Sequence, residues 1–179
     1  EYLHETDLKI FKAIKEVFVW HNIQYCAVGG TLLGAFTRKT FIPWDEDIDI
    51  SVFEEDYDRM IDLLMDELPD WMVVQCTKTD SNYYHEWIKV SDRYSVVYPN
   101  NGVYKNQGCW VDIYKLRKMP RKDVDLNIAL DHKAYLQRRL AIGDLTPQDY
   151  NDRMSLNSVE ERISEGKIKS DNSDDLEMV

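Results

Sequence analysis

One acidic segment of the chain alternates strictly between polar and apolar residues. It reads Asp47-Ile48-Asp49-Ile50-Ser51-Val52. A period of two belongs to a β-strand, in which successive side chains point to opposite faces of the sheet. The pattern therefore predicts a half-buried strand that presents both aspartates on one face and its apolar side chains on the other.

The same acidic residues allow two other interpretations. In an EF-hand, Asp45, Asp47 and Asp49 would take the first, third and fifth loop positions. However, Ile50 stands where that loop needs glycine, Asp56 stands where it needs glutamate, and the period of two is that of a strand. A purely structural edge strand with a solvated acidic face stays open as the second alternative.

Helical periodicity and end signals predict four helices, besides a short one at 31–36. Thr6 is the expected N-cap of the first, Gly143 the expected C′ residue of the third, and Thr146-Pro147 the expected start of the fourth. The first helix should bury one apolar face, made of Leu8, Phe11, Ile14, Val17 and Phe18. The second should bury Tyr57, Met60, Ile61, Leu64 and Leu68. The first three helices are expected over residues 6–20, 55–68 and 123–142.

Strands alternate with turn signals through the middle of the chain. A glycine pair, Gly29-Gly30, breaks the first strand before a short helix expected at 31–36. Asn100-Asn101-Gly102 predicts a hairpin turn. Besides the acidic strand, we expect strands over residues 24–28, 71–76, 87–90, 94–98, 103–104 and 109–116.

Charge and composition exclude several classes of protein. The formal net charge is −11, which disfavours binding to nucleic acid or anionic membranes but leaves a nucleotide possible if a metal supplies positive charge. The 179 residues, 44% of them hydrophobic, suit one ordinary globular domain. No apolar run approaches the roughly 20 residues that span a bilayer, and no signal peptide is visible.

The cysteines and histidines favour a reducing compartment and argue against zinc. Three widely spaced cysteines, Cys26, Cys76 and Cys109, do not suggest a disulfide framework. The four histidines lack metal-ligand spacing. We therefore expect a cytoplasmic protein, with a membrane-anchored Golgi form of a longer chain as the alternative.

Three groups of residues indicate phosphate chemistry. Asp47 and Asp49 offer two hard oxygen ligands on one strand face, and Asp112 is a carboxylate inside an apolar strand. Divalent cations such as Mg²⁺ bind a few carboxylates together with substrate phosphates. A glycine pair before a helix lets backbone amides approach a phosphate. The combination is typical of metal-dependent phosphoryl transfer.

The longest motif resembles the LicD family. Residues 29–35 read GGTLLGA, residues 42–50 read IPWDEDIDI, and residues 108–116 read GCWVDIYKL. The resemblance implies an α+β fold, a mixed sheet flanked by helices, as in the nucleotidyltransferases related to DNA polymerase β. It also implies transfer of an alcohol phosphate, phosphocholine foremost, from CDP-choline or another CDP-alcohol to a glycan hydroxyl, with release of CMP.

The resemblance also implies roles for individual residues. Asp47, Asp49 and Asp112 match the catalytic carboxylates that bind Mg²⁺ or Mn²⁺. Gly29, Gly30 and Thr31 match the phosphate-binding loop, and Arg38 matches a basic residue after it. Lys89 resembles a lysine between the acidic blocks. Two positions depart from the usual motif, Glu46 where aspartate is usual and Thr40 where glycine is common.

Residues 1–169 are expected to form the nucleotidyltransferase-like domain, and residues 170–179 a disordered acidic tail. Family members usually continue into a further C-terminal block that this sequence lacks, so the chain is either a truncated or a short member. Two other functions stay open: transfer of NMP from an NTP with release of pyrophosphate, and binding of nucleotide or metal without turnover. For a choline substrate, candidate aromatic residues for the ammonium group are Tyr83, Tyr84, Trp87, Trp110 and Tyr114, with a place in the core as their other interpretation.

Overall fold

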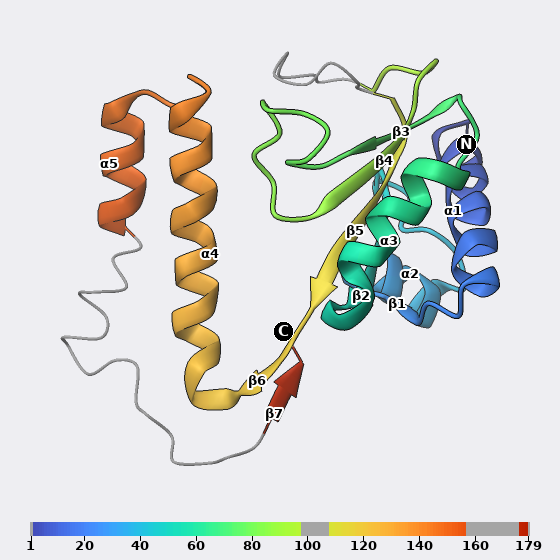
Figure 1. Cartoon of the computed structure of the whole chain (residues 1–179), viewed down its shortest axis with the longest axis horizontal. Coiled ribbons are helices and arrows are strands. Elements are labelled where there is room, and N and C mark those ends of the chain that lie inside the picture. Colours follow the sequence, from blue (N-terminus) through green and yellow to red (C-terminus); the bar gives the residue numbers. More distant parts are fainter. Residues whose placement is uncertain (1, 98–107, 157–175, 179) are drawn as a thin grey trace. The chain divides into compact units, whose positions relative to one another are not determined.

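The structure is a computed structural model that describes residues 2–97, 108–156 and 176–178. The chain divides into two compact units, Glu1–Leu116 and Arg117–Val179, each of which is described by itself (Figure 1). The first unit carries every candidate catalytic residue. The predicted domain boundary at residue 169 stays a prediction.

A mixed five-stranded sheet forms the centre of the first unit. Its strand order is β1-β2-β5-β4-β3, in which β2 and β5 run parallel and the other neighbours run antiparallel. This confirms the predicted α+β fold with a mixed sheet. The strands are β1 (Tyr25–Ala27), β2 (Ile48–Phe53), β3 (Met72–Gln75), β4 (Ile88–Asp92) and β5 (Trp110–Leu116).

The acidic strand β2 lies inside the sheet. It pairs with β1 on one side and with β5 on the other, so it is not an edge strand. The edge-strand interpretation of the acidic residues is therefore wrong. An internal position buries the backbone of β2 and places its aspartates among the side chains of β5.

Three helices accompany this sheet: α1 (Tyr2–Trp20), α2 (Gly29–Arg38) and α3 (Glu54–Glu67). Helices α1 and α3 contact each other and bury apolar stripes against one face of the sheet. The α3 stripe is the predicted one, with Leu68 partly buried just beyond the helix. The buried core contains Ile10, Ile14 and Phe18 of α1, Tyr57, Met60 and Leu64 of α3, and Ile50, Val52, Val90, Val111 and Ile113 of the sheet.

The start of α1 differs from the prediction. The helix begins at Tyr2, and the Thr6 hydroxyl donates a hydrogen bond to the Tyr2 carbonyl at 3.0 Å. Thr6 therefore lies inside the helix, where its hydroxyl bonds back to the preceding turn, and it is not the N-cap. Leu8 was expected on the buried face but is 38% exposed, while Asp7 is fully buried.

The strand predicted at 94–98 does not form over its described residues, 94–97. The Asp92 carboxylate accepts a hydrogen bond from the Tyr94 amide at 3.0 Å, which turns the chain at the end of β4. The Ser95 hydroxyl then accepts a bond from the Cys109 amide at 2.9 Å. The predicted hairpin at 100–102 lies outside the described residues.

The second unit contains β6 (Lys118–Pro120), α4 (Arg121–Ala141), α5 (Pro147–Leu156) and β7 (Leu176–Met178). Gly143 follows α4 with a φ of +79°, as expected of a C′ glycine. Thr146 caps α5, since its hydroxyl accepts a bond from the Asp149 amide at 3.1 Å. These observations confirm both predicted helix ends.

Of the predicted disordered tail, residues 170–179, the structure describes only Leu176–Met178, and the predicted disorder stays a prediction. Leu176–Met178 pairs antiparallel with β6, and residues 170–175 lie outside the described part. Leu176 and Met178 alternate with Glu177, a pattern that suits a short strand. Among the described helices, none combines the length and apolar character needed to cross a bilayer.

Candidate active site

A row of four polar side chains crosses the sheet on the face opposite the apolar core. Strand register pairs Asp49 on β2 with Asp112 on β5, Asp112 with Lys89 on β4, and Lys89 with Gln75 on β3. Register partners point to the same face. The sheet therefore aligns two predicted carboxylates and the predicted lysine, although they come from three separate parts of the sequence.

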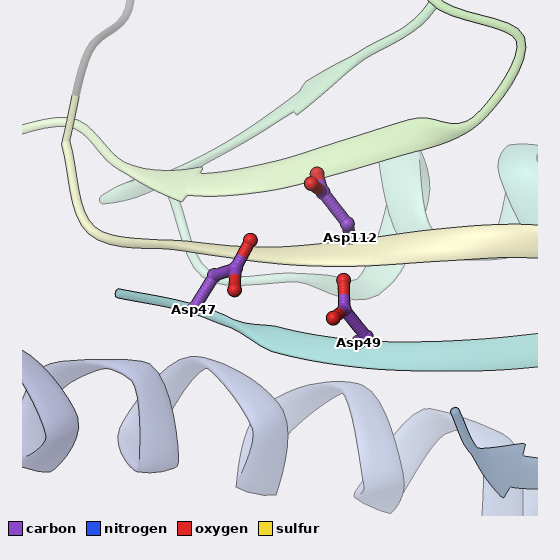
Figure 2. Close-up of side chains that lie close together, drawn as sticks. All are labelled: Asp47, Asp49 and Asp112. Atoms are coloured by element: carbon purple, nitrogen blue, oxygen red, sulfur yellow. The ribbon is translucent and has the colours of Figure 1, made fainter. Parts of the chain in front are cut away.

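Asp47 completes a cluster of three carboxylates. It lies directly before β2, and ligand oxygens of Asp47, Asp49 and Asp112 all lie within 4.8 Å of one another. Figure 2 shows the three side chains converging from two neighbouring strands. Three converging carboxylate oxygens suit one hard divalent cation such as Mg²⁺ or Mn²⁺. The predicted metal ligands thus fit the ion that the motif implies.

Lys89 and Trp110 hold Asp112 in position. The Lys89 Nζ lies 3.0 Å from Asp112 Oδ1 and 3.9 Å from the centre of the Trp110 ring. The Trp110 indole Nε1 donates to Asp47 Oδ2 at 3.0 Å and to Asp112 Oδ2 at 3.2 Å. One indole therefore bridges two of the three carboxylates, and the Lys89 ammonium lies against the face of its ring.

The site concentrates negative charge that these two donors offset only in part. Burial, followed by the charges of Asp49 and Asp112, raises the pKa of Asp47 to about 7. Burial also raises the pKa of Asp112, against the opposing effect of Lys89, and raises that of Asp49. Burial lowers the pKa of Lys89, while Asp112 opposes the change. A bound divalent cation would relieve this repulsion.

The glycine pair makes room for carboxylates at the start of α2. Gly29 has a φ of +54°, and a Cβ there would lie 2.8 Å from Asp49 Oδ2. A Cβ on Gly30 would lie 2.2 Å from Asp45 Oδ2. A side chain at either position would displace a carboxylate oxygen, and the positive φ of Gly29 further disfavours any other residue there. The structure therefore places the predicted phosphate loop directly against the carboxylates.

Thr31 and Arg38 lie at opposite ends of α2. The Thr31 hydroxyl accepts a hydrogen bond from the Asp49 amide at 2.8 Å, which ties the start of the helix to β2. Arg38 is exposed at the other end, seven residues or about 10 Å further along the helix, with its guanidinium 5.8 Å from the centre of the Trp44 ring. Thr31 thus contacts the acidic strand directly, while the described contact of Arg38 is with Trp44.

Two further aspartates, to which the motif alone assigns no role, lie beside the site. Asp7 of α1 is fully buried against the Trp110 backbone, and burial together with the charge of Asp47 raises its pKa to about 8. Asp45 lies over Gly30, and its carbonyl accepts a hydrogen bond from His4 Nε2 at 2.7 Å. The sequence signal for Asp45 was its place in the Asp45-Asp47-Asp49 series, while Asp7 had none.

Aromatic rings border the carboxylates on the same face. Trp87 and Tyr114 lie with ring centroids 5.2 Å apart, and the Tyr114 hydroxyl donates a hydrogen bond to the Asp49 carboxylate. His85 lies 4.0 Å from Trp87 and 4.5 Å from Tyr84, again between ring centroids. The sheet thus combines an acidic cluster that can hold a metal, an ammonium beside it, and an aromatic border.

Comparison with known proteins agrees with this geometry. Residues 22–134 match the family described as LicD/FKTN/FKRP, nucleotidyltransferase domain. That range contains the three carboxylates, the glycine pair and Lys89. Asp7 lies outside it.

Curated relatives align over shorter stretches. Over 47 residues the chain is 45% identical to the lipopolysaccharide cholinephosphotransferase LicD of Haemophilus influenzae. That alignment covers 26% of this chain and 18% of the relative. Over 48 residues the chain is 40% identical to uncharacterized proteins of Rickettsia prowazekii and Rickettsia typhi, covering 27% of this chain and 18% and 16% of theirs. The alignments span less than a fifth of each relative. By its match over residues 22–134, the chain belongs to the LicD/FKTN/FKRP nucleotidyltransferase-domain family.

Proposed function

We propose that this protein transfers an alcohol phosphate, phosphocholine foremost, from a CDP-alcohol to a glycan hydroxyl with release of CMP. The observation that carries the proposal is the convergence of Asp47, Asp49 and Asp112 within 4.8 Å, with Lys89 beside them. Carboxylates of this kind serve phosphoryl transfer by holding a cation that neutralises phosphate charge. Choline is the alcohol named for the Haemophilus influenzae relative.

Asp47 and Asp49 would hold Mg²⁺ or Mn²⁺, which when bound supplies positive charge to the donor phosphates. Both side chains are half-buried, so one side of the cluster faces outward for a substrate. Trp110 keeps Asp47 oriented through its indole hydrogen bond. Orientation of this kind lets charged groups act with little reorganisation.

Asp112 would complete the metal site, accept the proton of the attacking hydroxyl, or do both. Burial makes its carboxylate more basic than an exposed one. In the reaction the hydroxyl oxygen forms a bond to the phosphorus that bears the alcohol. The bond from that phosphorus to the bridging oxygen breaks, CMP leaves with the bridging oxygen, and the hydroxyl proton passes to the base.

Lys89 and the start of α2 would position the donor phosphates. The Lys89 ammonium lies beside Asp112, where it can also bind a phosphate oxygen. Backbone amides of Gly29, Gly30 and Thr31 begin α2, and a helix N-terminus favours an anion. Arg38, at the end of α2 and beside Trp44, would contact a more distant part of the donor.

We place the reaction in the cytoplasm, because a reducing compartment suits the three cysteines Cys26, Cys76 and Cys109, which are all free thiols. The cytoplasm also suits a CDP-activated donor. The acceptor would be a cell-surface glycan such as lipopolysaccharide or teichoic acid. The acidic net charge supports a small nucleotide donor over a nucleic acid.

A second function is transfer of NMP from an NTP, which the same carboxylates could support. Membership of a nucleotidyltransferase-domain family supports this second function. In that reaction the acceptor attacks the α-phosphate and pyrophosphate leaves. A third possibility is a module that binds nucleotide and metal without turnover.

Analysis of products separates these functions. The protein is incubated with Mg²⁺, a lipopolysaccharide preparation and either CDP-choline or CTP, and the products are followed by phosphorus NMR. Our proposal predicts CMP from CDP-choline and phosphocholine on the glycan. Pyrophosphate from CTP alone would support NMP transfer, and binding of either nucleotide without products would support the non-catalytic module.

A further inference from the structure

Four aromatic side chains form a continuous group at one border of the acidic cluster. We call Tyr84, His85, Trp87 and Tyr114 the aromatic border; successive ring centroids lie 4.5, 4.0 and 5.2 Å apart. Three come from the segment that leads into β4, and Tyr114 comes from β5. Tyr114 is two residues beyond Asp112 on the same strand face. The aromatic border therefore begins one pleat repeat from the third carboxylate.

The four rings of this border differ in exposure. Tyr84 is 4% exposed and has the burial of a core residue. Trp87 and Tyr114 are half-buried, so part of each side chain is exposed to solvent. Indole and phenol faces attract cations through their negative quadrupole, most strongly for tryptophan.

The electrostatic surroundings of Tyr114 favour a cation. The negative charges of Asp112, Asp49 and Asp47 all act on its hydroxyl, which also donates a hydrogen bond to Asp49. Lys89, the ammonium of the site, lies instead against the face of Trp110. The indole N–H of Trp110 is also engaged by two carboxylates. Of the five aromatic candidates, Trp110 is thus already engaged by Lys89, while Trp87 and Tyr114 pack against each other and each stays partly exposed.

We propose that the faces of Trp87 and Tyr114 bind the quaternary ammonium of the transferred alcohol, so that this pair selects choline over neutral alcohols. A quaternary ammonium has no N–H donor and is bound through aromatic faces and nearby negative charge. The proposal rests on the proposed function, because it assigns the alcohol end of the same donor. It differs from a role in nucleotide binding, which would not depend on the charge of the alcohol.

The first test uses the unaltered protein, so it does not depend on how a variant folds. Calorimetry with Mg²⁺ compares CDP-choline with its neutral isostere, in which a carbon replaces the choline nitrogen (CDP-3,3-dimethylbutanol). We expect CDP-choline to bind about 10-fold more tightly, in line with a desolvated cation–aromatic contact. Equal affinities would overturn the inference.

The second test locates the effect. Trp87→Leu should weaken CDP-choline by about 10-fold and the isostere by less than about twofold, while Trp87→Phe should retain most of the difference. Trp20→Leu, at a tryptophan that is 83% exposed on α1, is the matched control and should change neither affinity. Equal weakening of both ligands by Trp87→Leu, or none, would overturn the assignment to Trp87.

These outcomes separate the inference from the function on which it rests. If the unaltered protein binds CDP-choline and its isostere equally and Mg²⁺ is required, the inference fails and the proposed function stands. If it binds no CDP-alcohol with Mg²⁺, the proposed function fails and the inference fails with it.

Discussion

The two faces of the sheet in the first unit are built by alternate residues of the same strands, yet they differ in almost every physical property. Ile48, Ile50 and Val52 of β2 are at most 3% exposed and belong to the apolar core. Asp49, between them, points to the opposite face beside Asp112. Alternate residues of one strand therefore belong either to the stabilising core or to the candidate site. We expect that each of the two can be altered without the other.

The polar face is electrostatically unfavourable without a cation. Its carboxylates have raised pKa values because burial and mutual repulsion disfavour their charged forms. The apolar face has no such conflict. We therefore expect substitutions on the polar face to change ligand binding, and substitutions on the apolar face to change the free energy of unfolding.

The largest effect is expected from Asp49→Asn on the polar face. Loss of one anionic ligand should weaken Mg²⁺ or Mn²⁺ binding by about 100-fold or more, without lowering the free energy of unfolding, because a repelling charge is removed. Calorimetry and urea unfolding measure the two quantities. Asp58→Asn makes the same charge change at an exposed position of α3 and should leave metal affinity unchanged. Strong metal binding by Asp49→Asn would contradict the assignment of metal binding to the polar face.

Ile50→Ala, one residue along the same strand, should have the opposite effect. Ile50 is 1% exposed, so truncation should lower the free energy of unfolding by about 2–5 kcal/mol. Metal affinity of the folded protein should stay the same. Val19→Ala, at a position that is 69% exposed, is the control for a shortened β-branched side chain. A folded Ile50→Ala protein without metal affinity would show that the faces are coupled.

Gly29→Ala tests the boundary between the two properties. The substitution adds left-handed backbone strain and places a Cβ 2.8 Å from Asp49 Oδ2, so it should cost about 1–2 kcal/mol and also weaken metal binding. Gly143→Ala has similar backbone strain at a φ of +79° but nothing within 4 Å of its Cβ. It should reduce stability alone. Equal metal affinity in the two variants would contradict the assigned role of Gly29.

The pH dependence should also separate the faces. The pKa values of Asp47 and Asp7 are raised to about 7 and about 8, so the native protein holds more protons than the unfolded chain. Without metal, stability should therefore fall as pH rises from about 4 to about 8. Metal affinity should rise toward pH 7 as protons leave Asp47. Thermal unfolding with and without Mg²⁺ measures both, and a metal-free melting temperature that rises over this range would contradict the account.

The smallest effect is expected from a polar contact on the core side. The Tyr57 hydroxyl donates a hydrogen bond to the Ile113 carbonyl at 2.8 Å. Tyr57→Phe should lower the free energy of unfolding by about 1 kcal/mol, measured by urea unfolding. Metal affinity should not change, since the hydroxyl belongs to the core face. A change in metal affinity would again show coupling between the faces.

Local pattern was enough to predict the parts of the site that lie on one strand. The alternation at 47–52 predicted that Asp47 and Asp49 share a face, and the apolar surroundings of Asp112 marked it as unusual. Strand pairing was not readable in the same way. Lys89 reaches Asp112 because β4 pairs antiparallel with β5, a fact that no local period contains.

Residues placed by tertiary contacts were missed or misread. Asp7 reads as a polar position near a helix start, yet α1 begins at Tyr2 and carries Asp7 under the site. Thr6 has the residue type of an N-cap but bonds back to Tyr2 within the helix. Arg38 ends α2, and its predicted contact with the donor stays a prediction. The burial of Asp7 is set by the whole fold, whereas the role of Thr6 depends on where α1 begins.

The most direct test of the central claim is calorimetric titration of CDP-choline into the protein, first with Mg²⁺ and then with EDTA. The account predicts binding with Mg²⁺ that is lost in EDTA and in Asp49→Asn, because the acidic face binds the donor phosphates through a cation. Binding of equal strength in EDTA, or no binding in either condition, would contradict it.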